Sequence, residues 1–125
     1  MTTTTSIQLM FFGNAKKAMD FYTTTFRNSA IDEIEYDNEG LVRRAKFHIE
    51  NQALYCIDSP PVHQFTFTPS FSIFVDFDEE DEIKRVLEIL SKDGKTFMPF
   101  DNYGFSKKFA WISDVFGVSW QLNLK

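Results

Sequence analysis

Asp114-Val115-Phe116-Gly117-Val118-Ser119-Trp120-Gln121-Leu122 closes the chain with a polar turn followed by strand-forming residues. The residue types from Asp114 to Gly117 favour a tight turn, and the Val, Trp and Leu that follow favour a strand. Because this strand is so apolar, we expect it to lie inside a sheet rather than to fray at the terminus. Sixty-four positions earlier it matches Glu50-Asn51-Gln52-Ala53-Leu54-Tyr55-Cys56-Ile57-Asp58, where a polar turn again precedes an apolar strand.

The same offset of 64 relates a second pair of segments. Asp37-Asn38-Glu39-Gly40 matches Asp101-Asn102-Tyr103-Gly104 at three of four positions. A basic pair follows each turn at the same distance, Arg43-Arg44 in one case and Lys107-Lys108 in the other. Self-similarity at a fixed period indicates an internal duplication.

The first half of the chain is predicted to form a strand, a helix and three further strands. The helix begins at Asn14, carries an apolar stripe at helical spacing, and ends at Asn28-Ser29. The expected strands cover residues 6–12, 30–36, 41–49 and 52–58.

The second half is predicted to repeat this order after a linker, residues 59–69, that contains Pro60, Pro61 and Pro69. Asp78 is expected to begin the second helix and Gly94 to end it. The expected strands cover residues 71–77, 96–100, 105–113 and 118–124. The sequence therefore predicts a single α+β domain, residues 1–125, built from two tandem βαβββ modules at 6–58 and 70–124.

This arrangement resembles the vicinal-oxygen-chelate superfamily, which includes glyoxalase I, bleomycin-resistance proteins and extradiol dioxygenases. Three segments are similar to its PhnB-like branch, often labelled 3-demethylubiquinone-9 3-methyltransferase-like: Phe12-Gly13-Asn14-Ala15, Ala18-Met19-Asp20-Phe21-Tyr22 and Asp114-Val115-Phe116-Gly117-Val118-Ser119-Trp120-Gln121. The resemblance implies a glyoxalase-like curved mixed sheet that forms a cup, and it implies a homodimer.

Enzymes of this superfamily hold a divalent metal in the cup. The resemblance places the metal-ligand positions near Ile7, Ile57, Phe71 and Gln121, and of these only Gln121 has a side chain that can coordinate a metal. We therefore predict neither a metal site nor a cofactor. The methyltransferase label is also weakly supported, because Gly13 followed by Asn14 is not the glycine-rich turn that S-adenosylmethionine enzymes of the common type require.

A concave, largely apolar cup with a few polar groups is the usual form of a small-molecule site. The ligand-binding residues predicted from the sequence are Gln121, Ser119, Tyr55, Trp111, Phe71 and His48. Gln121 and Ser119 are the strongest of these, because polar side chains in a closing strand need hydrogen-bond partners. For Trp111 and for Phe109, another aromatic residue of the same expected strand, a purely structural role in the core is an equal alternative.

Three functions remain open. The first is a metal-free protein of the bleomycin-resistance kind that binds a small, partly aromatic molecule. The second is an enzyme with an unrecognised or metal-dependent site, in which His48, Cys56 or Tyr55 could be the acid–base group; no catalytic residue is assigned. The third is a structural or regulatory dimer whose cup is filled by side chains.

The amino-acid composition restricts the kinds of partner that the protein is expected to bind and the cellular compartment in which it is expected to occur. A net charge of −5 argues against nucleic acid and anionic membranes as partners. No apolar run approaches the ~20 residues needed to span a bilayer. A single cysteine, Cys56, cannot form an internal disulfide, which fits the cytoplasm.

Overall fold

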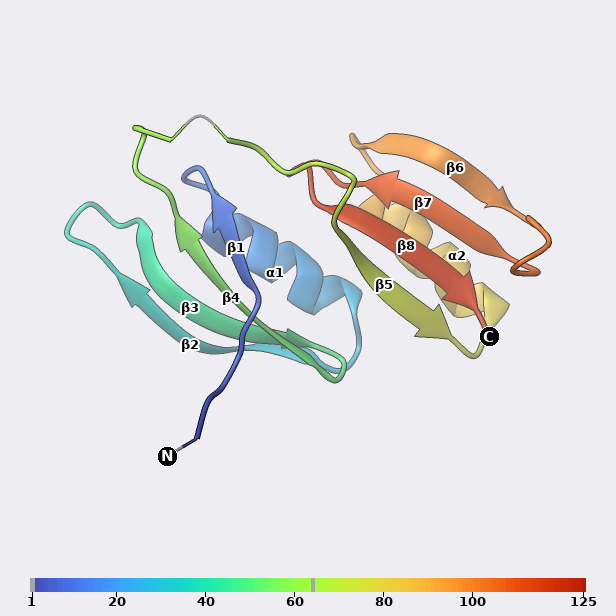
Figure 1. The fold of residues 1–125 in the computed structure, drawn as a ribbon, viewed down its shortest axis with the longest axis horizontal. Coiled ribbons are helices and arrows are strands. Elements are labelled where there is room, and N and C mark those ends of the chain that lie inside the picture. The colour runs from blue at the N-terminus through green and yellow to red at the C-terminus, as the bar shows by residue number, and fades with distance from the viewer. Residues whose placement is uncertain (1, 64) are drawn as a thin grey trace. The chain divides into compact units, whose positions relative to one another are not determined.

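The computed structural model describes residues 2–63 and 65–125. Within them the order βαβββ occurs twice (Figure 1). The elements are β1 (Gln8–Phe11), α1 (Ala15–Thr25), β2 (Ser29–Tyr36), β3 (Val42–Ile49), β4 (Gln52–Asp58), β5 (Ser72–Phe77), α2 (Glu80–Leu90), β6 (Lys95–Asp101), β7 (Phe109–Ser113) and β8 (Ser119–Leu124). The predicted α+β fold of two tandem modules is thus confirmed.

The chain divides into two compact units, Met1–Gln64 and Phe65–Lys125, which we call the first and the second unit. Each contains one four-stranded sheet and one helix. Neither helix in the described part of the chain is long and apolar enough to span a membrane.

In the first unit the strand order is β1-β4-β3-β2. β1 and β4 pair in parallel, whereas the other neighbours are antiparallel. α1 lies along one face of this sheet, as Figure 1 shows, and buries Ala18, Met19 and Tyr22. The rings of Tyr22 and Phe47 stack with centroids 6.3 Å apart, so the helix and β3 share one aromatic core.

The second unit has the corresponding order β5-β8-β7-β6. α2 covers one face of the sheet (Figure 1) and buries Ile83, Val86 and Leu90. Trp120 and Leu122 of β8 are also fully buried. Because side chains alternate along a strand, the residues between them face the other side of the sheet.

Strand pairing reproduces the repeat seen in the sequence. Gln8 pairs with Tyr55 in the first unit and Ser72 with Ser119 in the second, so both partners are shifted by 64 positions. The antiparallel pairs do not keep this offset. Tyr55 pairs with Lys46, whereas its counterpart Ser119 pairs with Ser113, which lies 67 rather than 64 positions after Lys46. The turn between β7 and β8 is therefore three residues longer than the turn between β3 and β4.

The predicted start of the first helix is confirmed, but its cap is supplied by a residue distant in the sequence. Asn14 occupies the N-cap position and its side chain makes no capping hydrogen bond. Instead, Asp58 at the end of β4 accepts hydrogen bonds from the backbone N–H groups of Gly13 at 3.0 Å and Ala15 at 2.9 Å. The other oxygen of Asp58 accepts from the backbone of Val42 at 2.9 Å.

Two predicted boundaries of the second helix are wrong. The N-cap residue is Glu79 rather than Asp78, which forms an ion pair with Lys125. The helix ends at Leu90, before Gly94, and Asp93 rather than Gly94 has a positive φ, of 60°. Gly94 is required for a different reason, because a Cβ there would lie 2.1 Å from the backbone oxygen of Ser113.

Five strands, β1, β3, β5, β7 and β8, begin later than predicted, and the shifts of β5 and β7 concern residues near the candidate site. β5 begins at Ser72, and Phe71 lies in the preceding turn with 56% of its surface exposed. β7 begins at Phe109 rather than at residue 105. Residues 105–108 form a loop, in which the ring of Phe105 packs edge-on against Phe109 with centroids 5.0 Å apart.

Candidate functional site

The candidate site lies on the face of the second unit's sheet opposite α2, which we call the open face. Two of its central side chains, Ser119 and Gln121, alternate along β8 with the buried Trp120 and Leu122. Strand register places the remaining side chains in rows across the sheet. The rows are Ser72–Ser119–Ser113, then Phe74–Gln121–Trp111, then Asp76–Asn123–Phe109.

A hydrogen-bond network joins the first two rows. The indole Nε1–H of Trp111 donates to Ser119 Oγ at 2.8 Å. The hydroxyl groups of Ser119 and Ser72 lie 2.6 Å apart, and the Gln121 amide nitrogen donates to Ser72 Oγ at 3.2 Å. These four side chains come from β5, β7 and β8, so the packing of the sheet fixes their positions.

Aromatic rings surround this network. Phe74, which is 55% exposed, and Trp111 flank Gln121 on its two neighbouring strands. Strand register places Met98 of β6 opposite Trp111, and the ring of the adjacent Phe97 has its centroid 5.1 Å from that of Trp111. Phe109 is buried beneath Phe74, with centroids 6.2 Å apart, and beneath the loop rings of Tyr103 and Phe105. The open face therefore combines polar groups with exposed aromatic surface, which is typical of small-molecule sites.

The corresponding face of the first unit has a different character. Tyr55 lies between Arg44 and Lys46, whose charged groups are 5.8 Å and 5.9 Å from its ring centroid. His48 follows on the same strand as these two cations, and its Nδ1 lies 3.0 Å from a carboxylate oxygen of Asp32. In the described part of the first unit, this face presents an aromatic ring among charged groups rather than a network of hydroxyl groups.

The structure thus divides the six residues predicted from the sequence. Gln121, Ser119 and Trp111 lie together on the open face, joined through Ser72. Tyr55 and His48 lie in the first unit, on β4 and β3. Phe71 precedes β5 and lies outside the strand on which it was expected.

Sequence reasoning did not identify Ser72, Phe74 and Phe97 as site residues. Ser72 and Phe74 could have been found by pairing β5 in parallel with β8, because the repeat places these strands as β1 and β4 are placed. Phe97 gives no such signal, since β6 pairs with β7 through two irregularities of register on either side of Met98.

Among the candidate acid–base residues of the first unit, Cys56 lies apart from Tyr55 and His48. Cys56 is fully buried on the face that packs against α1, whereas its neighbour Tyr55 faces the other side. Burial, with a smaller contribution from Asp58, raises the pKa of the Cys56 thiol to about 12. The thiol is therefore protonated at neutral pH and is a poor nucleophile.

The donor set does not fit the divalent metal that the fold implies. The expected ligand positions hold Ile7, Ile57 and Phe71, which have no donor atom, together with Gln121. Among residues 2–63 and 65–125, no three His, Cys, Asp or Glu side chains gather where they could hold a metal ion. The amide nitrogen of Gln121 is hydrogen-bonded to Ser72, which leaves a single amide oxygen as a potential ligand.

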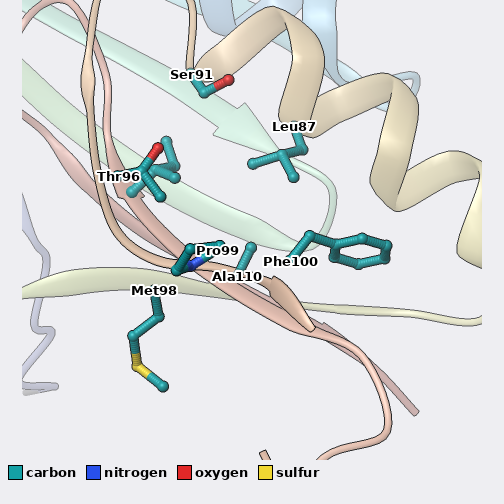
Figure 2. A pocket seen from close by; sticks show the side chains of 8 residues that line it. Leu87, Ser91, Thr96, Met98, Pro99, Phe100 and Ala110 are labelled. Atoms are coloured by element: carbon teal, nitrogen blue, oxygen red, sulfur yellow. The ribbon is translucent and has the colours of Figure 1, made fainter. Parts of the chain in front are cut away.

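A separate hollow of about 190 Å³ lies on the α2 side of the same sheet. Figure 2 shows Leu87 of α2 and Ser91, which directly follows the helix, near Thr96, Pro99 and Ala110, while Met98 points away from them. The polar groups here, Ser91 and Thr96, belong to the junction between α2 and β6. The hollow is smaller than most ligand sites, and we assign it no function.

Comparison with known proteins agrees with the fold and with the repeat. Residues 3–123 match the family described as 3-demethylubiquinone-9 3-methyltransferase. The chain belongs to this family. It therefore belongs to the PhnB-like branch of the vicinal-oxygen-chelate superfamily, which confirms the resemblance seen in its sequence. A search of curated proteins found no match.

Solved structures of family members and of more distant relatives have the same fold. The PhnB protein of Bacillus cereus, which carries the family's name, is 43% identical, with a TM-score of 0.93 over 98% of this chain and 100% of that one. Protein PA1353 of Pseudomonas aeruginosa is 22% identical, with a TM-score of 0.82 over 99% and 98% of the two chains. FosX of Listeria monocytogenes, a fosfomycin resistance protein, is 12% identical, with a TM-score of 0.68 over 98% and 93%.

Proposed function

We propose that this chain is a small-molecule-binding protein and that its ligand contains an aromatic ring. The observation that supports this most directly is the row Phe74–Gln121–Trp111, in which an amide group lies between two aromatic side chains. Stacking on these rings would provide affinity, and the hydrogen-bond network through Ser72 and Ser119 would fix the orientation of the ligand.

Metal-dependent chemistry is not part of this proposal. FosX has been crystallised with Mn(II) and a dihydroxypropylphosphonic acid, and at 13% identity it shares only the fold with this chain. Of the four positions at which the fold would place metal ligands, two are isoleucines, one is a phenylalanine, and the fourth is Gln121. Hard or borderline cations need several charged or imidazole donors in one shell.

Methyl transfer, which the family name suggests, is also not supported by the residues. The turn between β1 and α1 has one glycine, Gly13, and the backbone N–H groups of Gly13 and Ala15 are already bonded to Asp58. Those groups are therefore not available to a nucleotide-like cofactor at this turn.

Two-dimensional ¹H–¹⁵N NMR can test the proposal, because the chain contains only two indole N–H groups. Trp111 lies on the open face, whereas Trp120 is fully buried and donates to Asp114 Oδ2 at 2.9 Å. Titration with 2-naphthol should shift the Trp111 resonance in a saturable manner and leave that of Trp120 in place. The Trp111→Phe variant assigns the two resonances.

A pair of phenylalanine variants locates the site. Phe74→Ala removes an aromatic ring beside Gln121 and should weaken 2-naphthol binding about tenfold, as expected for the loss of one stacking contact. Phe12→Ala, which removes a partly exposed ring in the first unit, should leave binding unchanged. Equal weakening in both variants, or no shift of Trp111 at any concentration, would rule out the open face as the binding site.

A further inference from the structure

The donor–acceptor pattern of the open face can be followed from atom to atom, starting at Trp111. An indole N–H can only donate, so Ser119 Oγ is the acceptor in their 2.8 Å bond. Ser119 is 1% exposed, and its own proton must therefore be donated inside the protein. The hydroxyl group of Ser72, 2.6 Å away, is the acceptor that the structure provides.

The hydroxyl oxygen of Ser72 therefore accepts two hydrogen bonds. One comes from Ser119 and the other from the amide nitrogen of Gln121. A serine hydroxyl has two lone pairs and one proton, so with both lone pairs occupied its remaining capacity is to donate. Ser72 is only half-buried, and its O–H is therefore directed to the open face.

Gln121 contributes the complementary group. Its amide nitrogen bonds to Ser72, and its carbonyl oxygen has no hydrogen-bond partner among the described residues. Gln121 is also half-buried, so this oxygen can be reached by a ligand. The open face thus presents one donor, from Ser72, directly beside one acceptor, from Gln121.

Charges on the open face stand apart from this pair. Strand register puts Lys95 beside Ser113, three strands from Ser72, a separation of about 14 Å at the usual strand spacing. Asp76 lies in the next row beyond Phe74 and accepts a hydrogen bond from Asn123 at 2.8 Å. Asp76 is four residues along β5 from Ser72, about 13 Å at the usual rise of a strand, so neither charge is close enough to pair with a charged ligand group, which favours an uncharged one.

We propose that Ser72 and Gln121 select uncharged ligands in which a hydrogen-bond donor lies next to an acceptor, as in a carboxamide or lactam, attached to an aromatic ring. The ligand carbonyl accepts from the Ser72 hydroxyl, and the ligand N–H donates to the carbonyl oxygen of Gln121. The ring lies against Phe74 and Trp111. This inference rests on the proposed function and specifies its ligand class.

Three probes with the same ring system test it by the NMR titration of Trp111. 2-Naphthamide has both the donor and the acceptor, N,N-dimethyl-2-naphthamide has only the acceptor, and 2-naphthoate has only acceptors and a negative charge. 2-Naphthamide should bind about five- to tenfold more tightly than either of the others, which corresponds to one neutral hydrogen bond. Equal or tighter binding of the dimethyl amide or of the naphthoate would overturn the inference while leaving the aromatic site intact. Failure of all three to bind would contradict the proposed function itself.

Variants assign the selectivity to the two side chains. Gln121→Leu removes the acceptor and should bring the affinity for 2-naphthamide to within about twofold of that for the dimethyl amide, because neither probe can then donate to residue 121. Ser72→Ala removes the donor to the carbonyl group that both amides share, so it should weaken both by a similar factor, about five- to tenfold, and leave their ratio unchanged. Ser113→Ala is the matched control, because Ser113 lies in the same row as Ser72 without belonging to the network, and it should retain full selectivity. An unchanged Trp120 resonance shows that each variant is folded. Full selectivity in Gln121→Leu, or undiminished binding of both amides to Ser72→Ala, would refute the assignment.

Discussion

Trp111 and Trp120 show how strand alternation gives different roles to the same kind of side chain. Trp120 is fully buried and donates to Asp114, and it is therefore part of the core. Trp111 faces the other side of the sheet and donates to Ser119. The indole N–H of each is satisfied, but only that of Trp111 belongs to a network that reaches the surface.

At the same scale, Cys56 gives the chain a pH dependence in the alkaline range. Because burial raises the pKa of its thiol from 9.0 to about 12, the folded protein retains this proton where the unfolded chain has lost it. Stability should therefore fall as pH rises above 9, by up to about 1.4 kcal/mol per pH unit. Urea denaturation at pH 8 and at pH 10 measures the change.

The Cys56→Ala variant isolates this effect from that of other alkaline groups. The variant is expected to be less stable at pH 8 because of the cavity, but its stability should decline less between pH 8 and pH 10. Parallel decline of the two proteins would show that Cys56 ionises in the folded state as readily as in the unfolded one.

At the scale of elements, the sequence predicts best where local signals agree. β4 has its predicted bounds, because a tight turn at Glu50 and an apolar alternation coincide there. The start of β7 is misplaced because the strand-forming residue Phe105 packs instead with Tyr103 and Phe109 in a loop. The cap of α1 could not be predicted locally, since Asp58 lies 43 residues from Ala15.

The residues of the candidate site likewise divide into those that the local sequence predicts and those that depend on tertiary structure. Ser119 and Gln121 could be assigned to one face of β8 from the period of a strand alone. Ser72 and Phe74 join them only through the parallel pairing of β5 with β8, which depends on tertiary structure. Predicting site residues on a neighbouring strand therefore requires the register of strand pairing as well as the alternation of side chains along each strand.

The junction between α2 and β6 depends on close approach of the backbone at Gly94. Replacing Gly94 with alanine would place a Cβ 2.1 Å from the carbonyl oxygen of Ser113, so the turn must move away from β7. We expect Gly94→Ala to destabilise the protein by about 3 kcal/mol, the upper range for overpacking. Denaturant midpoints measure the change in the free energy of unfolding.

Gly104→Ala is the comparison for this variant. Gly104 has a φ of +86°, and the space that an alanine Cβ would occupy has no neighbouring atom within 4 Å. The cost there is therefore backbone strain alone, about 1 kcal/mol. A Gly94→Ala variant at least as stable as Gly104→Ala would show that the junction adapts without loss.

At the scale of the whole molecule, each unit repeats the other in topology but not in surface chemistry. The first unit presents Tyr55 among cationic groups, and the second presents rings around a hydroxyl–amide network. Duplication has therefore kept the pairing of strands while the exposed side chains have diverged. The ligand proposal is accordingly confined to one unit.

Association of two chains is a further prediction at this scale. The superfamily resemblance implies a homodimer, and large apolar side chains such as Phe71, Phe74 and Phe105 are more than half exposed. Sedimentation velocity at micromolar concentration should give a mass of about twice 14.6 kDa. A single species of 14.6 kDa at concentrations up to about 100 µM would contradict this prediction.

The three hydrogen bonds of Asp58 have a consequence for the order in which the first unit folds. They link the end of β4 to segments 45, 43 and 16 residues away. Closing long loops costs entropy, so this carboxylate meets its partners only after β1 has been brought beside β4. Interactions that form after the rate-limiting step slow unfolding rather than speed folding. We therefore expect the hydrogen bonds of Asp58 to lengthen the lifetime of the folded unit without hastening its formation.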